Sequence, residues 1–203
     1  MLRRDYTIIQ DTREKKPLLF GAQPGGDPRY LPMLRDVDGS TTTIRLHVVR
    51  SKLDTGDYAL RGYERLCLIE RKGSIREVAQ NCLTGDRLRV GRAFGRLRSE
   101  CRMPVLLLEG TMSSLLKCRY TKKPYAALDA LLRLIAEYDL RLLMLSTSTV
   151  GMRQQMGELV ARLLINTAVA YDVAKNKTIQ SGPTMPGMSF SPDDGDSNVW
   201  EHV

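Results

Sequence analysis

The chain has 203 residues, with 31 Lys and Arg against 23 Asp and Glu, which gives a formal net charge of +8. This length is enough for one well-buried α/β core and a tail, but short for two ordinary domains. No signal peptide precedes the first expected strand, and no apolar run is long enough to cross a membrane. We therefore expect an intracellular, cytoplasmic protein that is not secreted and does not enter membranes.

The charge is unevenly distributed along the chain. Residues 180–203 contain four acidic residues and no Lys or Arg, so the remainder carries 31 basic against 19 acidic residues, a net charge of +12. Such an excess suits a polyanion such as nucleic acid, although many basic proteins bind none. From about Thr178 the composition is rich in Gly, Pro and Ser and cannot bury a core. We predict a folded domain over residues 1–177 and a disordered acidic tail over residues 178–203.

The first predicted strand covers Tyr6 to Ile9. It leads into the segment 11–14, Asp-Thr-Arg-Glu, and so delivers two acidic residues at the end of a strand, where open α/β sheets bind their ligands. Residues 15–43 are dense in Pro and Gly and predict a long irregular connection. This connection either folds over a substrate or is an ordinary surface loop. A second strand is expected from Ile44 to Val49.

A short apolar run, residues 66–69, ends in Glu70, Arg71 and Lys72. Side chains alternate along a strand, so Glu70 and Lys72 share one face and Arg71 lies on the other. If the preceding Gly-Asp turn folds back beside this strand, Asp57 comes next to Glu70. Two carboxylates suit Mg²⁺, and an adjacent lysine could orient a water. The alternative is a strand end with a solvated cluster of charges.

The pattern becomes helical from Ser74, which forms a capping-box pattern with Glu77. A break is expected at Gly85-Asp86, followed by a second helix whose core stripe is Val90, Phe94, Leu97 and Cys101. Arginines recur on the neighbouring face of that helix. They could grip phosphates along a duplex, or form a solvated cationic face without a partner.

Three further elements are expected after this helix. Residues 104–109 form an apolar strand of the kind buried on both faces. A basic segment with Tyr120 and Tyr125 follows, and these tyrosines either bind single-stranded nucleic acid or serve as packing residues. Pro124 opens a helix with the apolar stripe Leu128, Leu131, Leu132 and Ile135.

The last two predicted elements are a buried strand over Arg141 to Leu145 and a final helix. That helix has a wide apolar face, which packs against the sheet or forms a subunit interface; its members are Met152, Met156, Leu159, Val160, Leu163 and Leu164. The four cysteines have no zinc-ligand spacing and are expected to be buried free thiols. No phosphate-binding Gly-rich loop ending in Lys-Ser or Lys-Thr is present, so no nucleotide cofactor is expected.

Four sequence blocks occur in a characteristic order: IIQDTRE, KLDTGDYAL, LCLIERKGSIREV and PVLLLEG. Over roughly residues 5–165, this set resembles the nuclease domain of XPF-type structure-selective endonucleases, a branch of the PD-(D/E)XK superfamily. The resemblance implies an α/β fold with a restriction-endonuclease-like mixed central sheet flanked by helices. No tandem helix-hairpin-helix module is visible, so a stand-alone member of bacterial or viral type is expected.

The resemblance also implies an active site. Its metal ligands would be Asp57, Glu70 and Asp11, with Arg71, Lys72 and Glu14 completing the catalytic set. The family's usual aspartate four residues after the lysine is replaced by Arg76, and Glu77 is the expected substitute. The expected cofactor is Mg²⁺, for which Mn²⁺ could substitute. The expected DNA-binding residues are Arg13, Arg87, Arg89, Arg92, Arg96, Lys122 and Lys123.

The implied activity is Mg²⁺-dependent endonucleolytic cleavage of branched, flapped or junction DNA, with a possible homodimer because nuclease domains of this family pair. The alternative is a catalytically inactive nuclease-like module that binds DNA or a partner protein. The family's silent members have lost their site acids, whereas this chain keeps Asp57, Glu70 and Lys72. This favours an active enzyme.

Overall fold

A computed structural model describes residues 5–31, 42–117, 119–146 and 149–180. The chain divides into two compact units, Met1–Ala170 and Tyr171–Val203. All strands of the described residues lie in the first unit. Most of the predicted acidic tail lies outside the described residues, so its disorder and the boundary at residue 177 stay predictions.

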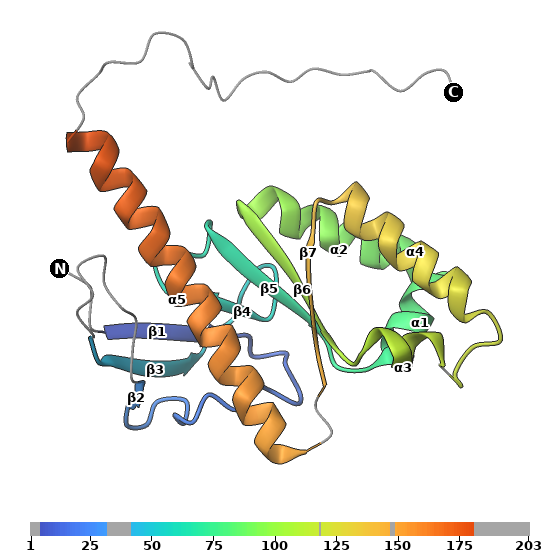
Figure 1. The fold of residues 1–203 in the computed structure, drawn as a ribbon, viewed down its shortest axis with the longest axis horizontal. Coiled ribbons are helices and arrows are strands. Elements are labelled where there is room, and N and C mark those ends of the chain that lie inside the picture. Colours follow the sequence, from blue (N-terminus) through green and yellow to red (C-terminus); the bar gives the residue numbers. More distant parts are fainter. Residues whose placement is uncertain (1–4, 32–41, 118, 147–148, 181–203) are drawn as a thin grey trace, which may run out of the picture. The chain divides into compact units, whose positions relative to one another are not determined.

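The first unit is built on a seven-stranded sheet with the order β2-β3-β1-β4-β5-β6-β7 (Figure 1). The strands are β1 (Asp5–Gln10), β2 (Arg29–Leu31), β3 (Ile44–Arg50), β4 (Tyr58–Leu60), β5 (Cys67–Lys72), β6 (Met103–Glu109) and β7 (Arg141–Leu145). Strand β1 is parallel to β3 and antiparallel to β4, which is in turn antiparallel to β5. Strands β5, β6 and β7 are mutually parallel. The sheet is therefore mixed, and the predicted fold class is confirmed.

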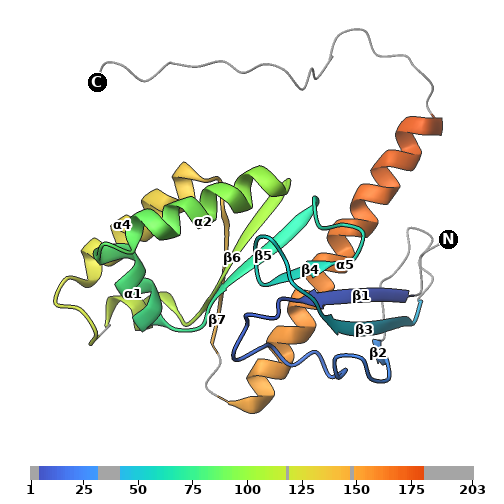
Figure 2. The same cartoon turned by 180° about the vertical axis from the view of Figure 1, so that it is seen from behind.

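Helices cover both faces of this sheet (Figures 1 and 2). Their bounds are α1 (Ile75–Leu83), α2 (Arg87–Glu100), α3 (Met112–Leu116), α4 (Pro124–Glu137) and α5 (Val150–Gln180). One core lies between the sheet and the part of α5 that belongs to the first unit, and includes Ile69 and Val160. The other lies under α1, α2 and α4, and includes Leu68 and Phe94. The final helix thus packs against the sheet, which was one of its two predicted roles.

The structure corrects three predictions about small elements. The expected irregular connection over residues 15–43 contains the short strand β2, which pairs with β3 at the edge of the sheet. Helix α3 lies in a segment for which no helix was predicted. Strand β7 is the opposite edge strand and is only partly buried, because it has a neighbour on one side alone. The prediction of a buried strand there was wrong.

The predicted apolar faces of α4 and α5 are rotated from the observed ones. Leu132 and Leu159 belong to the predicted apolar faces, but they are 45% and 41% exposed. Alanines take the buried positions, as in Ala127 and Ala130 of α4. Small side chains let a helix approach its neighbours closely, and a pattern search for large apolar residues overlooks them.

None of the helices in the described part of the chain combines the length and apolar character needed to span a membrane. The cysteines Cys67, Cys82 and Cys101 are buried free thiols, as predicted. Cys118 lies outside the described residues.

Candidate active site

Three acidic residues occupy neighbouring positions across three adjacent strands. In the ladder, Gln10 pairs with Tyr58, and Tyr58 pairs with Ile69. The residues next to these are Asp11 after Gln10, Asp57 before Tyr58 and Glu70 after Ile69, so the three acids continue the same row across the sheet. The Asp11 N–H donates to the Asp57 carbonyl at 2.9 Å. Side chains alternate along strands, so these positions share the sheet face of Ile9, Ala59 and Leu68, on which α1, α2 and α4 pack.

Gly56 gives the turn that brings Asp57 to this position. Its φ of +78° lies in the left-handed region, which favours glycine. A Cβ atom at this residue would lie 3.2 Å from the Ile69 carbonyl oxygen. The chain can therefore pass close to β5 here, and the Asp57 N–H donates to that same carbonyl at 2.7 Å.

Asp57 is half-buried and carries the most perturbed carboxyl group of the site. Burial raises its pKa to about 7, and the negative charge of Glu70 adds to the effect. The Arg71 N–H, which donates to Asp57 Oδ2 at 2.7 Å, opposes the shift without cancelling it. The negative charge of Glu70 thus makes the ionisation of Asp57 less favourable.

Lys72 lies beside the same pair of acids. Its Nζ is 2.7 Å from Glu70 Oε1 and 3.7 Å from Glu77 Oε1. Burial lowers the pKa of this lysine, but the charge and hydrogen bond of Glu70 outweigh burial and raise it overall. Lys72 therefore stays protonated at neutral pH.

Glu77 reaches Lys72 because of how α1 begins. The Ser74 hydroxyl accepts from the Glu77 N–H at 3.1 Å and caps the helix. The Glu77 carboxylate accepts the N–H of Gly73 at 3.0 Å, where the predicted capping box would have used that of Ser74. The structure thus places Glu77 next to the lysine, whereas Arg76 lies over the ring of Tyr120.

Asp11 is fully buried and is engaged by hydrogen-bond donors. Its carboxylate accepts from Arg13 Nε at 2.7 Å and from the Leu53 N–H at 2.7 Å. Burial alone would raise its pKa, but these donors and the Arg13 N–H lower it. The Arg13 guanidinium is also attracted by the charges of Asp57 and Glu70.

No group of three or more His, Cys, Asp or Glu side chains suited to a metal is found within the described residues. The Asp11 carboxylate is committed to Arg13 and Leu53. Of the three expected ligands, the structure therefore leaves Asp57 and Glu70 as the adjacent pair.

Arg71 lies on the opposite face of β5 and joins two further acids. It forms an ion pair with Glu14 at 3.0 Å and a hydrogen-bonded ion pair with Glu109 at the end of β6. All three side chains are largely buried. Sequence reasoning assigned no role to Glu109, although it stands in the PVLLLEG block, at the end of an apolar strand.

The predicted DNA-binding residues are all exposed. Arg87, Arg89, Arg92 and Arg96 lie along α2, and Lys122 and Lys123 precede α4. Arg13 is exposed but held by Asp11, and Arg89 is 3.4 Å from Asp86. Tyr120 and Tyr125 are 66% and 68% exposed, so their interpretation as packing residues was wrong.

Comparison with solved structures shows which known folds this architecture resembles. XPF from Aeropyrum pernix matches with a TM-score of 0.52 and 18% identity, over 77% of this chain and 60% of that one. The same protein in complex with DNA matches with a TM-score of 0.51 and 20% identity, over 78% and 64%. The chain has an XPF-like nuclease fold. It spans less than two thirds of those XPF chains. No protein-family model and no curated protein matches the sequence.

Proposed function

We propose that this protein is a Mg²⁺-dependent endonuclease that cleaves branched or flapped DNA. One observation carries the proposal: Asp57 and Glu70 lie side by side with Lys72 at the end of β5, in an XPF-like nuclease fold. One of the similar structures is a complex with DNA, which supports DNA as the substrate.

The donor set fits a hard divalent cation. Carboxylate oxygens are the ligands that Mg²⁺ and Mn²⁺ prefer. The high pKa of Asp57 reflects burial and repulsion from Glu70, and a cation would relieve that repulsion. Asp57 and Glu70 would hold the ion. When bound, it would polarise the scissile phosphate and acidify a water.

The remaining residues position the reacting groups. Lys72, held by Glu70 and Glu77, keeps a positive charge where negative charge develops on the phosphate. Arg71, between Glu14 and Glu109, fixes the end of β5 against β6. Asp11 orients Arg13 toward the site acids, so we assign Asp11 a positioning role.

The exposed arginines of α2 would hold the DNA backbone. Arg87, Arg92 and Arg96 form no ion pair with any described residue, so their charge is free for phosphate. Contacts of this kind give affinity without reading the base sequence. Selectivity would then come from the shape of the DNA, as expected for a nuclease acting on branches.

A cleavage assay tests the proposal. Labelled flap, fork, junction and linear duplex DNA are incubated with Mg²⁺ or with a chelator. We expect Mg²⁺-dependent cutting of the branched substrates. Asp57→Asn should lower the cleavage rate by at least roughly 10²-fold and leave DNA binding intact or tighter, because it removes a ligand charge next to phosphate.

Asp54→Asn is the matched control, because Asp54 is an exposed acid of the same loop. It should cleave at the normal rate. DNA binding without Mg²⁺-dependent cutting would instead identify the protein as an inactive nuclease-like module.

We also propose that two copies of the chain pair. Sedimentation velocity would then show the mass of a dimer.

A further inference from the structure

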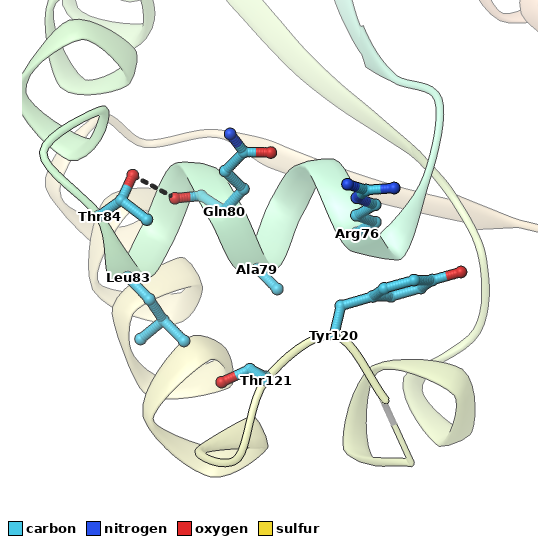
Figure 3. A pocket seen from close by; sticks show the side chains of 7 residues that line it. All are labelled: Arg76, Ala79, Gln80, Leu83, Thr84, Tyr120 and Thr121. Atoms are coloured by element: carbon cyan, nitrogen blue, oxygen red, sulfur yellow. Dashed lines mark hydrogen bonds between the residues drawn. The ribbon is translucent and has the colours of Figure 1, made fainter.

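A pocket of about 640 Å³ lies between α1 and the segment that leads into α4 (Figure 3). Its lining comes from two places in the chain. Helix α1 and its end provide Arg76, Ala79, Gln80, Leu83 and Thr84, and the segment before α4 provides Tyr120 and Thr121. The volume is within the range of pockets that hold small organic ligands.

The lining combines an aromatic ring, apolar side chains and hydrogen-bonding groups. The Tyr120 ring is 66% exposed, and the Arg76 guanidinium lies 5.6 Å from its centroid. Leu83 is also partly exposed at 37%. Thr84 donates its hydroxyl hydrogen to the Gln80 carbonyl at 2.8 Å, while the Gln80 side chain is exposed. No acidic residue lines the pocket.

The pocket is lined by α1, the helix that follows Lys72 in the chain. Arg76 is in the first turn of α1, four residues after Lys72. At the other end of α1, Arg87 of α2 lies three residues after Thr84. The intervening Asp86 forms an ion pair with Arg89. Lys122 and Lys123 follow Thr121 and are exposed. Basic residues therefore adjoin the pocket-lining residues in the chain, as suits a site that receives a nucleic-acid strand.

We infer that this pocket binds one unpaired nucleobase of the DNA strand. The inference rests on the proposed nuclease function and specifies how the site recognises a branch. Every base has a flat face that can stack on an aromatic ring, and Gln80 offers both a donor and an acceptor to a base edge. A base stacked inside a duplex cannot enter, whereas a base in a single-stranded arm can.

Equilibrium DNA binding in a chelator tests the inference without requiring cleavage. The probes are flap DNAs in which one base of the single-stranded arm at a time is replaced by an abasic residue. We expect one position near the branch at which the loss of the base weakens binding roughly 5- to 160-fold, the range for one base stacked on one aromatic ring. Linear duplex DNA should show no such position.

Variants of Tyr120 assign that effect to the pocket. In Tyr120→Ala the abasic position should have no further effect, and flap affinity should fall to that of the abasic complex. Tyr120→Phe keeps the ring and should behave as the natural chain does. Tyr125→Ala is the matched control, because Tyr125 is equally exposed but does not line the pocket.

The outcomes separate the two proposals. If the protein binds flap DNA but no abasic position weakens binding, the pocket does not hold a base and the nuclease proposal stands. The same conclusion follows if Tyr120→Ala weakens flap and duplex binding equally. If the natural chain binds no DNA, both proposals fail.

Discussion

Asp57 is a carboxyl group whose ionisation destabilises the folded chain. A carboxyl group with a pKa of about 7 in the folded chain and 3.8 ordinarily costs stability once it ionises. Below pH 4 the group is protonated in both states, and the cost is absent. It grows as the pH rises toward 7 and is complete above that value.

Asp57→Asn should therefore stabilise the metal-free protein, and more so at higher pH. Asparagine cannot ionise and can still accept the Arg71 N–H. Because Asp57 is only half-buried, water screens part of the repulsion, and we expect a gain on the order of 1–3 kcal/mol at pH 8. Urea unfolding in a chelator at pH 5 and pH 8 measures this gain. A gain that is equal at the two pH values would contradict the assigned pKa.

Gly56 and Gly62 both adopt a backbone conformation that favours glycine. Both have positive φ, +78° and +84°, but only Gly56 would place a Cβ atom in a crowded space. Gly62→Ala should cost roughly 1 kcal/mol of stability, from its backbone conformation alone. Gly56→Ala should cost about 1–3 kcal/mol more and also reduce cleavage, because Asp57 moves. Similar costs at both positions in thermal unfolding would rule out crowding as the reason for Gly56.

Among the secondary-structure elements, α2 carries the proposed contact with the DNA backbone. One face is buried through Val90, Phe94 and Leu97, which leaves the arginines in solvent. Each phosphate that a protein neutralises adds about 0.9 to the slope of log Kobs against log salt concentration.

Replacing Arg92 and Arg96 together by alanine should therefore weaken DNA binding and reduce the magnitude of that slope by about 2. The control is the double replacement of Arg61 and Arg65, two exposed arginines in the β4–β5 connection. This connection is at the end of β5 opposite Glu70, so the loss of these two arginines should leave the slope unchanged. If both double variants change the slope equally, the contact is not specific to α2.

The predictability of each element followed from its periodicity. Strands β1, β3, β5 and β6 and helices α1 and α2 were predicted because large apolar residues or capping residues marked them. Short β2 and α3 depend on pairing and packing with distant residues, which a local pattern does not contain. Similarly, the strand that carries Glu70 was predicted, but the short neighbouring strand β4 was not, and the hydrogen bond from Leu53 to Asp11 required the folded loop.

The proposed function depends on which charged residues lie on each side of the sheet. Asp11 of the β1 end, Asp57 before β4, Glu70 and Lys72 of β5 and Glu77 of α1 meet on one side of the sheet. On the other side, Arg71 joins Glu14 and Glu109 within largely buried surroundings. In the proposed function, the first side would carry the chemistry and the second would support it. The pairing of Glu109 with Arg71 could have been predicted only by treating the ends of all the parallel strands as parts of one site.

Calorimetric titration of the protein with Mn²⁺ at several pH values shows whether Asp57 and Glu70 hold a divalent cation. We predict that the natural chain binds Mn²⁺ and releases close to one proton at pH 5.5, falling to almost none at pH 8.5, because Asp57 must be ionised to bind. Asp57→Asn should bind far more weakly without this proton release, while Asp54→Asn should match the natural chain. Absence of Mn²⁺ binding, or equal binding by Asp57→Asn, would contradict a metal site at Asp57 and Glu70.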